Sequence, residues 1–475
     1  MLPYQEPRCE LSFSIGAVLP HGSISRLWED VVKRFGKKTL AEVLASAIDL
    51  AEEGFPLGPM TAEQWAKGHL QGEESHRVLR PGGRNPQTGD LIRNPDLAKT
   101  FRILGARGAR EGFYSGEVAN SIVEALREFD GVMTLDDLTS HFTAVEDPIS
   151  VVYKGYRVYE TPPPTQGLPV LIALSILEKT SPDPTEFKRG SELQAHYGIE
   201  AMRLAFADAL QYISDPRHLH TPLTELLSQG YIASRASCIK LESSTVESGN
   251  VSEFRDGDTV YFCCIDADGN GCSMINSNYM HFGTGIMAKG YGFTIQNRGF
   301  NFSLERGHPN QLAPRKRPYH TIIPCIITNE SDGSLFSVLG NMGGFMQPQG
   351  HLQLIRNLLD FKMSPQAAVD APRWMLNGLG ATQSHTDVRD SHVFLEDGYG
   401  GESDGGGAGD KGERVVQALK GRGHMIDAVL RGTDRELVGR GQIIIRDKST
   451  HVLSAGSDPR ADGCAVPVVG PIGRL

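Results

Sequence analysis

Apolar residues in the first half of the chain recur every three to four positions, which is the period of an amphipathic helix. The clearest case begins at Thr39-Leu-Ala-Glu42, where a threonine and a glutamate three residues later form a capping box. Apolar positions continue to Ala51, and Gly54 supplies a stop signal. The same period predicts further helices over 94–106, 118–129, a short stretch from Thr134, 168–178, 194–213 and 349–361.

Alternation of apolar and polar residues indicates strands elsewhere. Residues 151–159 alternate in this way and end at a run of prolines from Pro162, which cannot continue a sheet. Residues 259–265 are rich in β-branched and aromatic side chains, Asp268-Gly269 predicts a turn, and residues 272–276 return as a second strand. Helices, then strands, then helices again predict a layered α/β fold rather than a doubly wound one.

Two glycine-rich stretches follow in the second half. Leu335 to Leu339 predicts a strand that leads into Gly340-Asn-Met-Gly-Gly344 and then into a helix. Backbone N–H groups in such a turn converge with a helix dipole behind them, which suits a developing oxyanion. An ordinary strand-to-helix turn explains the same pattern. The Gly- and Asp-rich stretch 396–412 predicts a flexible surface loop.

Composition and net charge limit the classes of partner that are expected. Apolar residues make up 39% of the chain and charged residues 22%, enough for a large core. A net charge of -10 argues against nucleic acid or an anionic membrane as partner. The longest apolar run, Leu168 to Leu177, is too short to span a bilayer. No secretory signal is visible at the start of the chain, and seven cysteines without a CxxC motif favour reduced thiols, so a cytoplasmic location is expected.

Thr259 is the candidate nucleophile. A threonine hydroxyl needs a base, and the α-amine of an N-terminal threonine, with a pKa of about 8, is one. Cleavage between Asp258 and Thr259 would free that amine, and Asp256-Gly-Asp258 is a turn-prone stretch. Threonine at the start of a strand is also an ordinary β-former.

Cofactor and metal motifs are not expected. Phe282-Gly-Thr-Gly285 partly fits a dinucleotide fingerprint, but Lys289-Gly-Tyr-Gly292 follows where a helix is required. The chain has no HExxH motif and no Walker-type lysine loop. Cys263 and Cys264 are adjacent on a predicted strand and point to opposite faces, so they cannot easily share a metal.

Several motifs occur in an order that resembles the γ-glutamyltranspeptidase (glutathione hydrolase) family. They are EGFYSGEVA at Glu111–Ala119, PPPTQG at Pro162–Gly167, Asp258-Thr259, IDADGN at Ile265–Asn270, FGTGI at Phe282–Ile286, QNRG at Gln296–Gly299, RPYHTIIP at Arg317–Pro324, GNMGG at Gly340–Gly344 and AGSDPRADG at Ala455–Gly463. The resemblance implies a four-layer αββα sandwich of the N-terminal-nucleophile hydrolase type. It also implies self-cleavage into a large-subunit-like region, 1–258, and a small-subunit-like region, 259–475, that pair in one fold.

The resemblance implies four catalytic residues. Thr259 is the nucleophile, with its freed amine as base. Ser277 occupies the position of a second threonine that supports the nucleophile, and the substitution keeps the hydroxyl. Gly343 and Gly344 match the glycine pair of the oxyanion hole.

Five expected substrate-binding positions depart from the family pattern. Tyr279 replaces an asparagine, Arg298 a glutamine, and Asn301 an acid that pairs with the substrate ammonium. His320 and Thr321 replace two serines that hold a carboxylate. A cationic Arg298 would repel an ammonium and attract a carboxylate. Arg298 can alternatively be a salt-bridge residue and His320 a core hydrogen-bond donor.

The substitutions resemble a divergent branch that includes oxamate amidohydrolase-like proteins. The chain also starts at a point corresponding to the interior of the large subunit, so central strands and a substrate-binding arginine of the family are not expected in it. The leading hypothesis is a self-cleaving γ-glutamyltransferase or glutathione hydrolase-like enzyme that acts on small-molecule amides. The alternatives are an amidohydrolase for another carboxylate amide, such as oxamate, and a silent family member that never matures.

Overall fold

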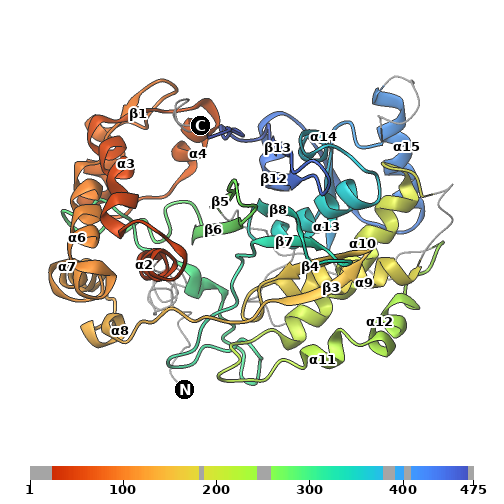
Figure 1. Cartoon of the computed structure of the whole chain (residues 1–475), viewed down its shortest axis with the longest axis horizontal. Helices are drawn as coiled ribbons and strands as arrows, with labels where there is room; N and C mark the ends of the chain where they lie inside the picture. Colours follow the sequence, from red (N-terminus) through yellow and green to blue (C-terminus); the bar gives the residue numbers. More distant parts are fainter. Residues whose placement is uncertain (1–23, 181–186, 243–257, 378–390, 401–407, 469–475) are drawn as a thin grey trace, which may run out of the picture.

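The computed structural model describes residues 24–180, 187–242, 258–377, 391–400 and 408–468. Its largest sheet is antiparallel and has six strands in the order β13-β12-β8-β7-β4-β3 (Figure 1). The strands are β3 (Ile149–Tyr153), β4 (Tyr156–Glu160), β7 (Cys325–Asn329), β8 (Leu335–Met342), β12 (Arg440–Arg446) and β13 (Leu453–Ser457).

A hairpin of β5 (Asp258–Ile265) and β6 (Gly271–Tyr279) packs against one face of this sheet. Its inner side chains include Tyr261, whose ring lies against Gly340 of β8 so closely that a Cβ there would overlap it. Gly271, at the turn end of the hairpin, faces Val338 and Leu335. The first residues of β5 therefore lie near the end of β8, and Ile265, its last residue, lies near the start of β8.

Helices cover the other face of the six-stranded sheet. Residues of α9 (Gly167–Thr180) are apolar on nearly every side, and most of them are buried between the sheet and the neighbouring helices. The remaining elements of this side are α10 (Glu192–Tyr212), α11 (Leu223–Leu226), α12 (Gln229–Ala236), α13 (Met346–Leu359), α14 (Pro365–Asp370) and α15 (Ala408–Gly421), with a small sheet of β9 (Trp374–Asn377), β10 (His392–Glu396) and β11 (Ile426–Leu430), and 3-10 turns η2 (Arg298–Asn301) and η4 (Gly432–Val438).

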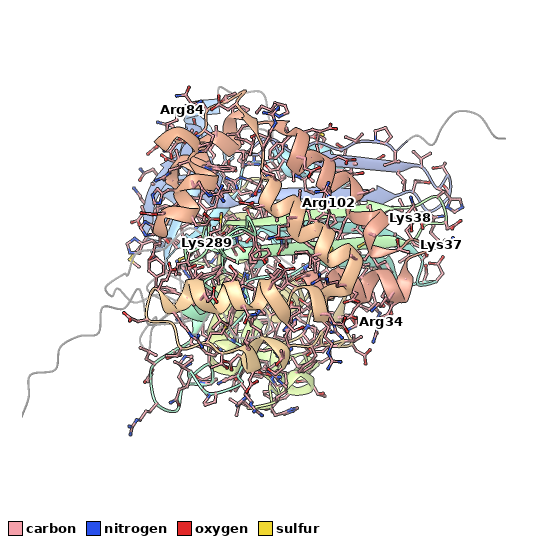
Figure 2. The ribbon with its side chains drawn as sticks, turned by 90° about the vertical axis from the view of Figure 1, so that its left-hand side faces the viewer. Arg34, Lys37, Lys38, Arg84, Arg102 and Lys289 are labelled. Carbon is pink, nitrogen blue, oxygen red and sulfur yellow. The ribbon has the colours of Figure 1, made fainter. Side chains whose placement is uncertain are left out.

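The N-terminal helices form the fourth layer, beyond the hairpin, and have their own core around Leu104 and Ile122. Figure 2 looks onto this layer from outside, with the strands behind it. It contains α2 (Ile24–Phe35), α3 (Leu40–Glu53), α4 (Pro59–Lys67), α5 (Gly72–Leu79), α6 (Pro95–Gly112), α7 (Gly116–Arg127) and α8 (Leu135–Thr139), with the short β1 (Phe55–Pro56), β2 (Leu91–Ile92) and η1 (Pro81–Gly83). The order helix, hairpin sheet, six-stranded sheet, helix confirms the predicted αββα arrangement.

Most predicted elements are confirmed, and two predictions were wrong. The capping box of α3 forms, with the Thr39 hydroxyl accepting from the Glu42 N–H at 3.2 Å. Residues 151–159 are two strands rather than one, because Lys154 and Gly155 both take positive φ angles, 50° and 82°, and make a hairpin turn. The predicted loop 396–412 is shorter than expected, since Glu396 ends β10 and α15 begins at Ala408.

Among the helices of the described ranges, none is both long and apolar enough to cross a bilayer.

Candidate active site

Thr259 and Ser277 meet across the hairpin. Thr259 lies at a register shift between Asp258 and Val260, where β5 bulges against β6. The Thr259 side chain turns inward and is 5% exposed, whereas Val260 turns outward and is 62% exposed. The Thr259 hydroxyl donates to Ser277 Oγ at 3.0 Å, and the backbone N–H of Tyr279 donates to the same Ser277 oxygen at 2.8 Å. The predicted pair is therefore in hydrogen-bond contact.

The glycine pair lies at the same end of the sheet as Thr259. Tyr261, early in β5, lies against Gly340 near the end of β8, so the first residues of β5 approach the turn that follows β8. Gly343 and Gly344 have φ angles of 125° and 54°, conformations that side chains other than glycine rarely take. Within the described residues their N–H groups donate to no backbone carbonyl, and helix α13 starts two residues later.

Two buried contacts hold the glycine turn. The Gln166 side chain, from PPPTQG, donates to the Gly344 carbonyl at 2.7 Å. Arg373 donates to Asn341 Oδ1 at 3.0 Å and to the carbonyl of Gly439 at 3.1 Å. A turn with N–H groups available and carbonyls held is suited to bind an oxyanion.

Arg298 is a buried cation beside this pair. It is 2% exposed, and its Nη1 donates to Thr321 Oγ1 at 2.9 Å. Its guanidinium lies over the Tyr279 ring at 5.2 Å, a favourable cation–π position. The Nη2 atom is buried without a hydrogen-bond partner, and no carboxylate pairs with Arg298 in the described part of the chain. Burial lowers the pKa of Arg298 to about 10, so it remains charged at neutral pH.

His320 stands next to this cation and is neutral. Burial, and then the charge of Arg298, lower the pKa of His320 to about 3. Its Nδ1 lies 2.7 Å from the Pro318 carbonyl, so Nδ1 carries the proton and donates it there. The ring therefore offers the lone pair of Nε2 to a neighbour and no charge.

A cavity of about 320 Å³ contains part of the candidate site, and Thr259 and the glycine pair are not among its lining residues. Ser277, Arg298 and His320 line it, together with Arg317 and Glu146. The other predicted binding residues do not line the cavity. Thr321 and Tyr279 contact the Arg298 guanidinium, through a hydrogen bond and the aromatic ring respectively. Asn301 donates to the Tyr319 carbonyl at 3.0 Å. The structure therefore places two of the five predicted binding residues on the cavity wall.

Sequence reasoning missed Glu146 and Arg317 as members of this wall. Arg317 donates to Glu146 at 2.9 Å and also to Asp215, whose pKa burial would raise but whose arginine partners hold it below the usual range. Arg317 belongs to the RPYHTIIP motif, which was a signal for it. Glu146 lies in a segment without any motif, so nothing in the sequence indicated it.

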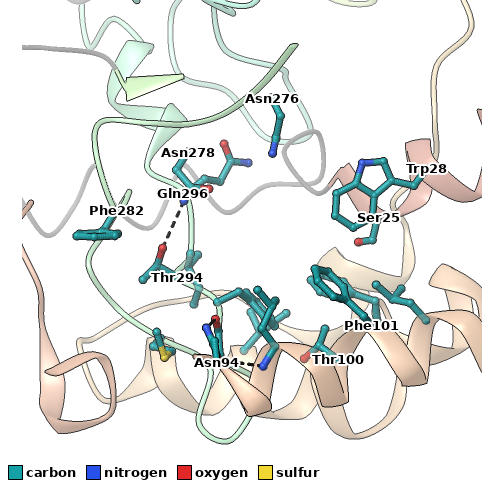
Figure 3. A pocket seen from close by; sticks show the side chains of 18 of the residues that line it. Ser25, Trp28, Asn94, Thr100, Phe101, Asn276, Asn278, Phe282, Thr294 and Gln296 are labelled. Atoms are coloured by element: carbon teal, nitrogen blue, oxygen red, sulfur yellow. Dashed lines mark hydrogen bonds between the residues drawn. The ribbon is translucent and has the colours of Figure 1, made fainter. Parts of the chain in front are cut away.

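A larger cavity, of about 380 Å³, lies on the other side of β6, between the hairpin and the N-terminal helices (Figure 3). Its lining includes Trp28 of α2, Phe101 of α6 and Asn278 of β6. Neighbouring strand residues point to opposite faces, so Asn278 and Ser277 open onto different spaces. Arg298, His320 and Ser277 do not line this cavity, although Asn276 lines both cavities.

Glu160, Cys325 and His351 are the one group of potential metal ligands in the described residues, within 4.8 Å of one another and buried. His351 Nδ1 and Glu160 Oε1 lie 2.7 Å apart. Burial raises the pKa of the Cys325 thiol well above its usual value, so the sulfur stays protonated and is a poor ligand. These contacts describe a hydrogen-bonded core cluster between the sheet and α13.

Comparison with known proteins places the whole chain in one family. The model of the family described as gamma-glutamyltranspeptidase matches residues 22–468. The glutathione hydrolase-like YwrD proenzyme of Bacillus subtilis (strain 168) is 33% identical over 442 residues, which are 92% of this chain and 78% of that protein. The oxamate amidohydrolase proenzyme of Klebsiella pneumoniae is 29% identical over 470 residues, 98% of this chain and 82% of that protein.

A solved structure agrees with this result. Cephalosporin acylase from Bacillus halodurans matches with a TM-score of 0.81 and 35% identity, covering 97% of this chain and 82% of that chain. The relatives thus carry several different hydrolase names, and their common feature is the fold with its family sequence pattern. The protein belongs to the γ-glutamyltranspeptidase family and is a hydrolase of the N-terminal-nucleophile type.

Proposed function

We propose that this protein cleaves itself before Thr259 and then hydrolyses small amides whose acyl group carries a carboxylate. The observation that carries the proposal is the buried, uncompensated charge of Arg298 on the cavity that also contains Ser277. A buried cation without a counter-ion is costly, and a substrate carboxylate would satisfy it. Arg298 therefore supports a substrate with an acyl carboxylate, with or without an accompanying ammonium.

Maturation begins with the Thr259 hydroxyl. It attacks the Asp258 carbonyl carbon, the C–N bond breaks, and an ester joins the Thr259 oxygen to Asp258. Water then hydrolyses the ester and leaves Thr259 with a free amine. The inward orientation of Thr259 at a strand bulge and its hydrogen bond to Ser277 support this assignment.

Catalysis uses the same hydroxyl on an external amide. The freed amine accepts the hydroxyl proton, the oxygen attacks the substrate carbonyl, and the N–H groups of Gly343 and Gly344 stabilise the oxyanion. The Thr259 amine passes this proton to the leaving nitrogen of the substrate, which departs as a free amine. Water then hydrolyses the ester of the acyl-enzyme. Ser277 orients the attacking hydroxyl throughout, and the neutral His320 offers an acceptor without adding charge.

A γ-glutamyl amide is the second candidate, and Glu146 is the observation that favours it. Such a substrate carries an ammonium as well as a carboxylate. Glu146 lines the same cavity and already accepts from Arg317 through one oxygen. Its carboxylate is an acid within this cavity that can pair with an ammonium.

The test is a substrate panel of anilides matched in size. Succinyl anilide carries the carboxylate, butyryl anilide lacks it, and γ-glutamyl anilide adds the ammonium. We expect kcat/KM for succinyl anilide to exceed that for butyryl anilide by about 10- to 150-fold, because a charge-assisted, buried contact contributes about 1.5–3 kcal/mol. Arg298→Gln should remove the difference, and Glu146→Gln should affect only γ-glutamyl anilide. Equal turnover of succinyl and butyryl anilide by the wild type would refute the carboxylate specificity.

A further inference from the structure

The outer face of the catalytic hairpin carries two cysteines opposite each other. Cys264 of β5 and Cys272 of β6 are register partners in the antiparallel pair. Directly opposite residues of antiparallel strands point to the same face. Both side chains are exposed, on the face of the hairpin that turns away from the six-stranded sheet.

Register pairing makes the two thiols neighbours on this face. Burial, and then the nearby Cys264 thiol, raise the pKa of Cys272. Opposite strand residues have Cα atoms about 4.5–5.5 Å apart, inside the 4.4–6.8 Å range that a disulfide needs. Cys263 differs from this pair: it lies next along β5, points inward, and packs with Tyr261 and Ile275.

We propose that Cys264 and Cys272 are a dithiol modification site, oxidised by low-molecular-weight disulfides to a disulfide that links β5 to β6. One cysteine thiolate attacks a sulfur of the oxidant, whose S–S bond breaks and releases one thiol. The other cysteine then attacks the mixed disulfide, forms the Cys264–Cys272 bond and releases the second thiol. Two protons and two electrons pass from the protein to the oxidant, so the reaction balances.

The disulfide would restrain the strands that carry Thr259 and Ser277. It closes a short loop around the Asp268-Gly269 turn and fixes the register of the hairpin near that end. Thr259 and Ser277 lie at the other end of the strands, so the bond touches neither. A short closed loop gives modest stabilisation, which we expect as a rise of roughly 2–5 °C in Tm.

The test is peptide mapping of the full-length protein after treatment with 2-hydroxyethyl disulfide. The peptide that spans both cysteines should lose two hydrogen masses, resist alkylation at Cys264 and Cys272, and recover both on reduction. Since the pKa of Cys272 is raised, oxidation should accelerate from pH 7 to pH 9. Cys263→Ser should still form the bond, and Cys264→Ser should yield only a mixed disulfide at Cys272.

Two results would overturn the proposal. One is oxidised wild-type protein in which both cysteines carry separate mixed disulfides and no internal bond. The other is a bond that maps to Cys263 and disappears in Cys263→Ser. Thr259→Ala should oxidise like the wild type, so the result does not depend on the proposed amide hydrolysis.

Discussion

Arg298 shows how a single residue can oppose stability and support function. The surroundings of Arg298 supply a threonine hydroxyl and an aromatic ring, which compensate only part of the cost of burying its charge. Such a group persists where a ligand supplies the missing counter-charge. The sequence predicted Arg298 as a binding residue. Its lack of a counter-ion depends on side chains from distant segments, so it could be seen only in the structure.

We predict that Arg298→Met raises stability while it lowers activity. Methionine fills similar space without a charge to desolvate, so the free energy of unfolding should rise by about 1–2 kcal/mol, measured by denaturant unfolding. The matched control is Arg203→Met: Arg203 is equally buried but donates to Glu200 at 2.7 Å, so its loss should destabilise. Equal destabilisation by both substitutions would show that Arg298 is an ordinary structural residue.

Ser277 could be predicted as a site residue from the sequence, whereas Glu146 could not. Ser277 kept a hydroxyl at a position the resemblance marked, and the structure brings it to 3.0 Å from Thr259. Glu146 reaches the site through Arg317, which is 171 positions away along the chain. Two residues so far apart in the sequence form no local pattern, so the contact between Glu146 and Arg317 could be found only in the structure.

At the scale of elements, sequence motifs predicted the helix starts and turns that are determined by neighbouring residues. A capping box determines where α3 begins, and the Asp268-Gly269 turn determines where the β5–β6 hairpin reverses. Alternation failed at residues 151–159 because a two-residue turn leaves the period unbroken while it reverses the chain. The glycine turn after β8 was predicted from its strand and helix neighbours, and its positive φ angles explain why glycine stands there.

We predict that Gly343→Ala impairs the oxyanion turn. A Cβ at a φ of 125° is strained and would lie 3.2 Å from the Cα of Gly439, so the turn must shift. Loss of one oxyanion donor lowers kcat by about 100–1,000-fold with a smaller effect on KM, measured with the anilide that the wild type prefers. Gly333→Ala is the control, because Gly333 also has a positive φ but no atom near its would-be Cβ. A Gly343→Ala enzyme with normal kcat would contradict the assignment.

At the scale of the whole molecule, the predicted cut does not divide the core. The six-stranded sheet combines β3 and β4, which precede Thr259, with β7, β8, β12 and β13, which follow it. Within this sheet, the two regions meet at the β4–β7 pairing. A cleaved protein would therefore stay together through one continuous sheet. The family resemblance implied that the two regions pair in one fold, whereas periodicity alone indicated only the order of helices and strands.

Self-cleavage before Thr259 is tested by the intact mass of the purified wild-type protein after prolonged incubation, beside Thr259→Ala and Thr259→Ser. We expect wild type to give two chains, 1–258 and 259–475, that separate under denaturing conditions and elute together under native ones. Thr259→Ser, which keeps a hydroxyl, should cleave more slowly, and Thr259→Ala should remain one chain. A wild type that stays uncleaved, or a Thr259→Ala protein cleaved at the same bond, would contradict the central claim.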